Sequence, residues 1–444
     1  MKDEKITFQR EIPVRHDVDV FVAGGGPAGV SAAVIAAREG RKVFLAEGHS
    51  SFGGMGTAGM VPGFVQFSDG VNFLAGGFGK ELVDKLVAMG NPVPMPDRQA
   101  MRIKTEILKR LYDDLMISCG AKFSLMTQLI GVEKDKDRVT TAILSGKSGL
   151  FGVKAKVFID CTGDGDLAAL AGAPFEKGDA EGNLMPGTLC SLWANIDWDV
   201  VDKYSPKPQS SKLEEAFNDK VFDVLDRHLP GMNNLGGGIG GGNISHAFGV
   251  DGTDEQSLTE HFISSRKLLL QYETYYKKYL RGFERMELVN TGSLFGIRET
   301  RRILGDYVMT VDDFVKRAVF DDEIGRYSYS IDIHPSKPSD ETYAAFRQEF
   351  KKTYAYKAGE SYGIPYRSLI PRTLANVLTA GRCISTDRYM HGSIRVMPGC
   401  FITGQSAGMA GALASEEEGN VRKIDVRELQ GRLKKIGAFL PNWS

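Results

Sequence analysis

The sequence predicts an α/β protein built on a parallel β-sheet with a β-meander, into which a smaller α+β unit is inserted. Three observations support this fold class. An apolar run, a glycine-rich turn and an alanine-rich helical segment follow one another over residues 17–39, as in a βαβ unit. Short stretches of alternating apolar and polar residues over 122–156 indicate a meander. The segment 190–350 then gains Tyr, Trp and charged residues, which marks a separate unit.

The first elements form one βαβ unit. Residues 17–23 are expected to form a short buried strand, and residues 30–39 a helix that Gly40 ends in the C′ position. A second strand over 42–46 ends at Glu47. Strands that are joined by such a helical crossover lie parallel in one sheet.

Later elements follow from the same patterns. Apolar positions at helical spacing predict a helix over 98–118, and a buried strand is expected over 157–160. A long helix is expected around 255–281 in the second unit. A strand is expected over 376–379 and a Gly- and Ala-rich helix over 400–414. Both resemble the elements of the first unit in their residue pattern.

The second unit has two further features. The Tyr-rich run 272–279 has helical spacing and is expected to pack internally rather than to form a stacking platform. Residues 236–242 contain a GxGxxG pattern, but no predicted strand precedes it and no helix follows. We therefore expect a flexible or ligand-contacting loop there instead of a second dinucleotide site.

The changes in pattern divide the chain into two domains. Residues 1–189 and 356–444 are expected to form one domain in two parts, and residues 190–355 an inserted cap domain. A chain of 444 residues is long enough for two or three domains of ordinary size.

Composition excludes several classes of protein. The 55 Lys and Arg residues nearly balance 56 Asp and Glu residues, so no nucleic-acid partner is expected. The uncharged stretches 20–37 and 396–415 are rich in Gly, Ala and Ser, and neither predicts a membrane span. The 5 cysteines are far apart, so neither a disulfide framework nor a metal site is expected. The N-terminus lacks the apolar core of a signal peptide, and we expect a cytoplasmic protein.

A dinucleotide-binding motif lies between the first strand and the first helix. Gly24, Gly26 and Gly29 form GxGxxG, and acidic Glu47 follows about 20 residues further on. The glycines allow a tight turn, close approach of a pyrophosphate and close helix–strand packing. Glu47 would accept hydrogen bonds from an adenosine ribose and repel a 2′-phosphate, which disfavours NADP. The motif alone leaves NAD and FAD open.

A second glycine-rich loop, Gly53–Gly59, favours a longer cofactor, because a simple NAD-binding βαβ unit has no need of one. With this loop, the chain resembles the glutathione-reductase-like flavoproteins. It resembles more closely the family of FAD-dependent oxidoreductases whose substrate domain is inserted between two parts of the FAD domain. The resemblance runs from about Asp17 to Leu413 and rests on GGGPAGVSAA, E47 with GGMGTAGM, FIDCTGDGDLAALAG, GIRETRRILGDY, IDIH, YGIPYRSLIP, NVLTAGRCIS and GSIRVMPGCFITGQSAGMAGALA.

The resemblance implies FAD as a non-covalent cofactor. Each implied contact is a residue of this sequence: Gly24, Gly26, Pro27, Ala28 and Gly29 for the pyrophosphate; Glu47 for the adenosine ribose; Gly54, Met55 and Thr57 for the ribityl and flavin region; Leu129 for adenine; Thr162 and Gly163 for the AMP half; Gly381 and Arg382 for the ribityl chain; and Arg395, Met397, Gly404 and Gln405 for the isoalloxazine. The N-terminus of the last helix would stabilise negative charge near flavin N1 and O2.

Departures from neighbouring families narrow the chemistry. The chain has neither the CxxxxC pair nor the second nucleotide domain of disulfide reductases. Met55-Gly56-Thr57 replaces the Ser-His-Thr of fumarate-reducing flavoproteins, which excludes histidyl attachment of flavin at that loop. His49 lies nearby, and a covalent role for it is the less expected alternative.

The candidate catalytic residues are Arg298, Arg302 and His391. Arg298, Arg301 and Arg302 form a basic cluster that suits a carboxylate or another anion, or else an ion-pair cluster with nearby acids. His334 and His391 are candidate proton carriers, and His391 is preferred because it lies between two flavin-side segments.

The predicted function is hydride transfer between flavin N5 and a small organic substrate, with an unidentified electron donor or acceptor such as NAD(P)H, a quinone, a carrier protein or oxygen. A flavin oxidase or monooxygenase is one alternative. A non-redox protein that binds NAD, of the thiazole-synthase type, is another. The substrate, the direction of reaction and the oligomeric state are left open.

Overall fold

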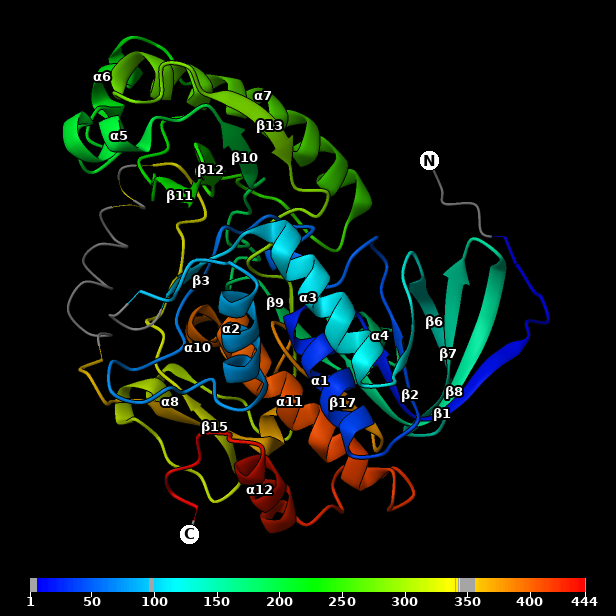
Figure 1. Ribbon diagram of the computed structural model, residues 1–444. Coiled ribbons are helices and arrows are strands. Elements are labelled where there is room, and N and C mark those ends of the chain that lie inside the picture. Colours follow the sequence, from blue (N-terminus) through cyan, green and yellow to red (C-terminus); the bar gives the residue numbers. More distant parts are fainter. Residues whose placement is uncertain (1–5, 96–99, 340, 342, 344–355, 444) are drawn as a thin grey trace.

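The computed structural model describes residues 6–95, 100–339, 341, 343 and 356–443. Within them, seven strands form a central sheet in the order β5–β2–β1–β8–β7–β6, with β17 also paired to β8 (Figure 1). The strands are β1 (Val14–Ala23), β2 (Val43–Ala46), β5 (Lys122–Ser124), β6 (Gln128–Asp135), β7 (Arg138–Gly146), β8 (Gly149–Asp160) and β17 (Val377–Thr379).

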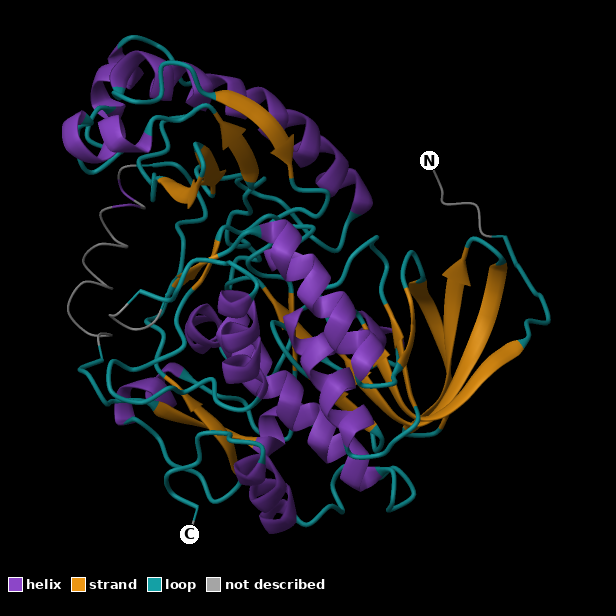
Figure 2. Ribbon diagram, viewed as in Figure 1, coloured by secondary structure: helices purple, strands orange, loops and turns teal. Residues whose placement is uncertain are grey.

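Strand β8 pairs with its neighbours in two different ways along its length. Its first half pairs antiparallel with β7, where Leu144 lies opposite Phe151. Its second half pairs in parallel with β1 on one side and β17 on the other, so that Phe158 lies between Phe21 and Val377. The meander β6–β7–β8 therefore continues directly into the parallel sheet, and Figure 2 shows the strands fanning apart at the meander end.

Helices α1 (Pro27–Arg38) and α11 (Met397–Ala414) pack against each other and against the parallel strands. Every residue of α11 is buried. A Cβ atom on Gly404 or Gly408 would overlap the carbonyl oxygen of Ala28 or Ala32 in α1, so glycine is what allows this close approach. The other helices around this core are α2 (Phe78–Ala88), α3 (Thr105–Ser118), α4 (Asp166–Leu170) and α12 (Val426–Lys435).

A four-stranded antiparallel sheet forms a second unit at the top of Figure 1. Its strands, in spatial order, are β11 (Met232–Gly236), β12 (Ile239–Gly242), β10 (Ser191–Ala194) and β13 (Glu287–Thr291). The long helix α7 (Glu255–Tyr279) covers it, with the short helices α5 (Trp198–Tyr204) and α6 (Leu213–Asn218) beside it. Tyr272, Tyr275 and Tyr276 of α7 are buried in a core of their own, which confirms their packing role.

The remaining elements are short. They are η1 (Gly54–Gly56), β3 (Gly63–Phe64), β4 (Met101–Arg102), β9 (Phe175–Lys177), β14 (Arg301–Ile303), α8 (Val311–Lys316), β15 (Glu323–Tyr327), β16 (Tyr362–Pro365), η2 (Tyr366–Leu369) and α10 (Arg388–Ile394). Strand β14 pairs with β9, and β15 pairs with β16 and contacts α11. The domain boundaries after residues 189 and 355 remain a prediction.

The structure confirms the predicted α/β class and corrects three local predictions. The helix expected over 98–118 begins at Thr105, because Met101 and Arg102 pair with β3; residues 98 and 99 lie outside the described part. The strand expected over 157–160 is the end of the longer β8. The glycine-rich 236–242 is the turn and second strand of the β11–β12 hairpin rather than a loop, because Gly236, Gly237 and Gly238 take positive φ angles at the turn.

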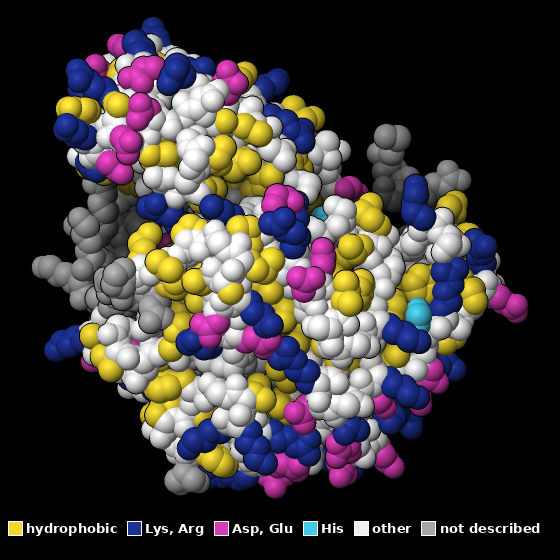
Figure 3. Space-filling view, viewed as in Figure 1, with side chains coloured by type: hydrophobic (Ala, Val, Ile, Leu, Met, Phe, Trp, Pro, Cys, Tyr) yellow, Lys and Arg dark blue, Asp and Glu magenta, His cyan; other side chains and the backbone are white. Residues whose placement is uncertain are grey.

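The surface carries mixed charge. On the face in Figure 3, Lys and Arg side chains alternate with Asp and Glu side chains, in keeping with 55 basic and 56 acidic residues. No helix in the described part of the chain combines the length and apolar character that crossing a membrane requires. All five cysteines lie in the described residues and are unpaired.

Candidate active site

A cavity of about 800 Å³ lies where the parallel sheet meets the antiparallel unit. Gly24, Glu47, Cys161 and Ala380 line it, and each is the first residue after one of the strands β1, β2, β8 and β17. The carboxyl ends of parallel strands are where open α/β sheets bind their ligands. The opposite wall comes from Thr188, His228 and the segment 293–298 of the inserted unit.

The turn after β1 is shaped for a phosphate group. Gly24 has φ +89°, and a Cβ atom on it would lie 2.6 Å from the carbonyl oxygen of Cys161. No atom lies within 4 Å of the position of a Cβ on Gly26, so the backbone is open to the cavity there. Helix α1 begins at Pro27 without a side-chain cap, which leaves its first-turn amides free for an anion.

Glu47 lies at the end of β2 and is 5% exposed. Its Oε2 accepts a hydrogen bond from the amide of Gly25 at 2.6 Å, and its Oε1 accepts one from the amide of His49 at 2.8 Å. These bonds hold the carboxylate against the glycine turn. A carboxylate has about four acceptor positions, so two remain for the hydroxyls of a ribose.

The loop after β8 is held by Asp160. This buried carboxylate accepts hydrogen bonds from the amide and hydroxyl of Thr162 and from the amide of Ala168. Burial raises the pKa of Asp160 to about 6. Thr162 and Gly163 thereby line the cavity, and the guanidinium of Arg382 covers Gly163 while pairing with Asp164 at 2.8 Å.

The N-terminus of α11 points to the same cavity, which Arg395, Val396, Met397 and Cys400 line. The helix has no side-chain cap, and Pro398 lies in its first turn. The Nη2 of Arg395 donates to Asp332, but the buried Nε of Arg395 has no hydrogen-bond partner. A buried donor without a partner and free helix amides both favour an acceptor group bound at this end.

Most of the predicted cofactor residues line this one cavity, namely Gly24, Gly26, Pro27, Ala28, Glu47, Gly54, Met55, Leu129, Thr162, Gly163, Gly381, Arg382, Arg395 and Met397. Four others lie behind its wall: Gly29, Thr57, Gly404 and Gln405. Gly29 and Gly404 allow close backbone packing against Gly24 and Ala28. The hydroxyl of Thr57 donates to the carbonyl of Phe52, and Gln405 Oε1 accepts from the amide of Phe78 at the start of α2.

Arg298 is the member of the predicted basic cluster that lines the cavity. It is 8% exposed, and its Nη1 donates to the carbonyl of Pro186 and the hydroxyl of Thr188, at 2.8 and 2.9 Å. No acidic side chain of the described residues forms a salt bridge with it. Burial and the nearby charge of Arg395 lower the pKa of Arg298 to about 10.

The other predicted catalytic residues lie outside the cavity lining. Arg302 pairs with buried Glu299 at 2.5 Å, and Arg301 pairs with Asp166 at 2.8 Å. His391 is fully buried, with Nε2 at 3.0 Å from the carbonyl of Arg382 and no partner at Nδ1. Burial lowers the pKa of His391 well below its usual value. Roles in catalysis for Arg302 and His391 remain predictions.

Three histidines from distant segments meet at the polar end of the cavity. His228 and His334 line it, His246 lies directly behind, and ring nitrogens of all three are within 4.8 Å of one another. Sequence reasoning considered only His334 among them. A local signal was present, because Asp226-x-His228 and Asp332-x-His334 repeat the same pattern.

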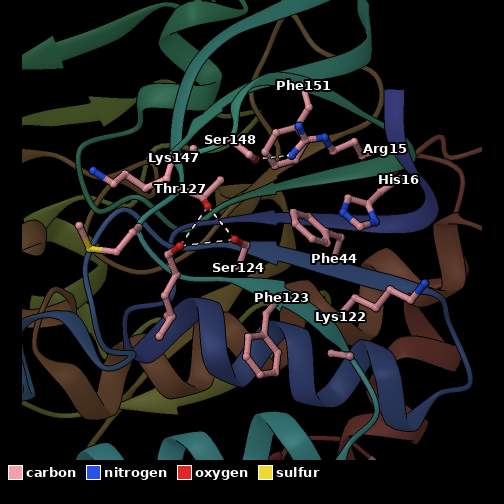
Figure 4. A pocket seen from close by; sticks show the side chains of 14 residues that line it. Arg15, His16, Phe44, Lys122, Phe123, Ser124, Thr127, Lys147, Ser148 and Phe151 are labelled. Atoms are coloured by element: carbon pink, nitrogen blue, oxygen red, sulfur yellow. Dashed lines mark hydrogen bonds between the residues drawn. The ribbon is translucent and has the colours of Figure 1, made fainter. Parts of the chain in front are cut away.

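Two separate hollows hold none of the predicted site residues. The one in Figure 4 measures about 580 Å³ and lies at the meander side of the sheet, with the basic side chains of Arg15, Lys122 and Lys147 around Phe44 and Phe151. Arg15 donates to Ser148 there at 2.8 Å. The other, about 920 Å³, lies beside the glycine turn of the β11–β12 hairpin.

The fold and the main cavity together define an α/β protein of the dinucleotide-binding type. The chain belongs to the family of FAD dependent oxidoreductases, whose family model matches residues 19–433. No curated protein matches the chain.

Several solved structures match most of the chain at low sequence identity. A geranylgeranyl bacteriochlorophyll reductase-like protein from Thermoplasma acidophilum is 13% identical, with a TM-score of 0.49 over 95% of this chain and 84% of that one. The flavin-dependent brominase Bmp2 is 10% identical, with a TM-score of 0.48 over 94% and 83%. The p-nitrophenol 4-monooxygenase PnpA from Pseudomonas putida is 11% identical, with a TM-score of 0.40 over 95% and 81%.

FAD is therefore the cofactor, and the cavity fits it. The open backbone at Gly26 and the free amides of α1 suit a pyrophosphate, and Glu47 suits a ribose. The unpartnered Nε of Arg395 and the first turn of α11 suit the polar edge of an isoalloxazine. FAD supplies the redox chemistry when bound, and the chain supplies its binding and orientation.

Proposed function

We propose that this FAD-dependent oxidoreductase is a dehydrogenase or reductase that transfers hydride between flavin N5 and a small organic substrate carrying a carboxylate or similar anionic group. Arg298 carries the proposal. Its buried guanidinium lines the cavity, and its hydrogen bonds go to neutral acceptors, Pro186 and Thr188.

A buried cation without a counter-ion is costly, and a bound anion would offset that cost. The two other arginines of the cavity, Arg382 and Arg395, already pair with Asp164 and Asp332. Arg298 is thus the cavity arginine that forms no salt bridge with a described residue, and Asp332 and Asp226 act on its charge only from beyond salt-bridge distance. Leu258, Phe262 and Phe295 supply apolar wall next to it, which suits a small substrate with one anionic end.

The remaining predicted residues fit supporting roles. The Arg302–Glu299 pair holds the chain on both sides of Thr300, because Glu299 also accepts from the amide of Met185 and from Arg388. We propose Arg302 as a positioning residue for the adjoining Arg298. His391 packs beneath the turn that carries Arg382.

The first test is the visible spectrum of the purified protein before and after acid precipitation. A two-band flavin spectrum that passes to the supernatant as FAD is expected for a non-covalent cofactor. Colour that stays in the pellet would indicate covalent attachment and point to His49, which also lines the cavity. A colourless protein that takes up no added FAD would overturn the proposal.

The second test compares acids with their uncharged forms. Small hydroxy and amino carboxylates are screened for anaerobic bleaching of the flavin, and keto and unsaturated carboxylates for reoxidation of the reduced protein; each is paired with its methyl ester. We expect the acids to react and the esters to fail. Arg298→Gln should raise KM for the acid by about 10- to 150-fold, the equivalent of about 1.5–3 kcal/mol for a charged hydrogen bond.

Arg432→Gln is the matched control, because Arg432 pairs with Glu39 and Glu428 far from the cavity lining. Its KM should equal that of the wild type. Esters that react as fast as acids would refute the anion assignment. Rapid release of peroxide during turnover would favour the flavin oxidase or monooxygenase instead.

A further inference from the structure

Two buried histidines contact each other at the polar end of the cavity. His246 Nε2 lies 2.9 Å from His334 Nδ1, and the side chains of the two residues are 1% and 7% exposed. The outer nitrogen of each ring faces a carboxylate: His246 Nδ1 lies 3.1 Å from Asp226 Oδ2, and His334 Nε2 lies 3.2 Å from Asp332 Oδ1. We call His246 and His334 the histidine pair.

The pKa of each flanking carboxylate is lowered from its usual value. Asp226 Oδ1 accepts hydrogen bonds from the amide of His228 and the hydroxyl of Tyr343. Burial opposes ionisation, but contact with His246 and Tyr343 keeps the pKa of Asp226 below its usual value. Burial is likewise outweighed at Asp332, whose pKa is lowered strongly by His334, Arg395 and Arg298.

The row of contacts lacks one proton. Of its three contacts, the one between His246 Nε2 and His334 Nδ1 has hydrogen-bond geometry. The two outer contacts bring a ring nitrogen within 3.1–3.2 Å of a carboxylate oxygen, and the buried His246 Nδ1 and Asp226 Oδ2 have no hydrogen-bond partner. A neutral imidazole carries one N–H, so two neutral rings supply two hydrogens for three contacts. In every neutral arrangement one contact therefore sets two lone pairs against each other. One added proton provides a hydrogen for each of the three contacts.

Burial and the charge of Arg298 oppose the uptake of that proton by the histidine pair. Burial is the largest cause of the lowered pKa of both rings, and the guanidinium of Arg298 adds to it at His334 and at His246. The other titratable or charged groups around the pair are Asp226, His228, Tyr272, Tyr329, Asp332, Tyr343 and Arg395. Since the two carboxylates favour the proton, neutralising Arg298 would tip the balance towards its uptake.

We propose that the histidine pair is a proton-binding site that fills when an anionic substrate pairs with Arg298, the proton lying between His246 Nε2 and His334 Nδ1. This inference deepens the proposed function and rests on it for the anionic substrate. His334 lines the cavity, so the pair stands where a bound substrate can exchange this proton. At neutral pH the pair then holds a proton only while substrate is present, and without substrate it takes up the proton only at lower pH.

The third histidine favours a proton over a metal ion at this position. The ring of His228 stacks on that of His246, with centroids 4.8 Å apart and planes 12° apart. Lone pairs of imidazole lie in the ring plane, so those of stacked rings do not converge on one ion. Burial and the neighbouring His246 lower the pKa of His228 to about 4, which leaves this ring neutral.

The experiment follows ring-nitrogen chemical shifts of ¹⁵N-histidine in the FAD-bound protein without substrate, across about pH 5 to 9. We expect the inner nitrogens of His246 and His334 to take up one proton in a joint titration. In Arg298→Gln this titration should move upward by about 1–3 pH units, because a cation close to a titrating group shifts it by that amount. In Asp226→Asn it should move downward. His16→Gln, on β1, removes one histidine signal and should leave the joint titration unchanged.

Three results would overturn the proposal: independent titration of the two rings, an unchanged titration in Arg298→Gln, or one equivalent of transition metal retained by the protein on elemental analysis. If Arg298→Gln fails to fold with FAD, Asp226→Asn decides by the direction of its shift. The experiment uses no substrate. A failed titration therefore leaves the comparison of acids with esters standing, and the reverse also holds.

Discussion

Glu47→Gln tests how the end of β2 recognises the cofactor. The carboxylate accepts backbone hydrogen bonds from Gly25 at 2.6 Å and His49 at 2.8 Å while it lines the cavity. A glutamine offers one oxygen in place of two, so its NH₂ group meets either a backbone N–H or a ribose hydroxyl that needs an acceptor. The substitution changes charge and hydrogen bonding but hardly changes volume.

Two separate effects are expected, one on stability and one on FAD binding. A buried N–H without an acceptor costs about 1–3 kcal/mol, which lowers the stability of the apoprotein. Loss of a charged acceptor at the ribose costs about 1.5–3 kcal/mol, which raises the Kd for FAD by about 10- to 150-fold. Glu47→Arg, which places a cation in the same buried position, should abolish FAD retention while the protein stays folded.

Fluorescence titration of apoprotein with FAD measures the Kd, and thermal unfolding of the apoprotein measures the stability. Glu39→Gln is the control, since it removes the same charge from a residue that pairs with Arg432 outside the cavity lining. A Glu47→Gln protein that binds FAD as tightly as the wild type would refute the ribose assignment. Retained flavin in Glu47→Arg would do the same.

Three further predictions concern the supports of the cavity. Gln405→Ala should cost about 1 kcal/mol of stability, because Gln405 Oε1 accepts a hydrogen bond from the amide of Phe78 at the start of α2. The Kd for FAD should stay unchanged. A higher Kd would place Gln405 in contact with the cofactor. Gly408→Ala should lower the melting temperature, because its Cβ would overlap the carbonyl of Ala32. Gly411→Ala should be tolerated, because the atom nearest its Cβ is the movable Cδ1 of Ile159 at 3.1 Å. Equal melting temperatures for the two variants would contradict the close packing of α1 and α11. Burial raises the folded-state pKa of Asp160 to about 6, so the contribution of Asp160 to stability should rise as pH falls from 7 towards 4. The measurement is the difference in free energy of unfolding between wild type and Asp160→Asn over that range. A difference that does not change with pH would show that the pKa of Asp160 is ordinary.

The start of the chain was predictable because its signals are local. The turn at Gly24, the small residues of α1 and the acidic end of β2 all depend on neighbours within the βαβ unit. The class of cofactor followed from these motifs and from the resemblance to a family, and most of the residues predicted to bind it line the cavity.

Other features depend on contacts between distant segments. His228, His246 and His334 come from three different parts of the chain, and only the packing of the inserted unit on the sheet brings them together. Which arginine of the basic cluster faces the cavity could not be predicted from the sequence either. Adjacent side chains of a strand point to opposite sides, and the sequence does not say which side faces the cavity. Arg301 and Arg302 reach acidic partners, and Arg298 alone of the three reaches the cavity. The β11–β12 hairpin was missed because glycine has low strand propensity, although it suits a tight turn.

Strand β8 has a consequence for biosynthesis. Its last residues pair with β17, so the edge of β8 at Phe158 stays unpaired until the later residue Val377 has been made. The cavity likewise draws its walls from Gly24 through to Cys400. On the ribosome, the nucleotide-binding half emerges long before its C-terminal wall, and an unpaired strand edge invites association with other chains. The cavity that holds the flavin is therefore complete only after the segment from β17 to Cys400 has been made and has folded onto β8.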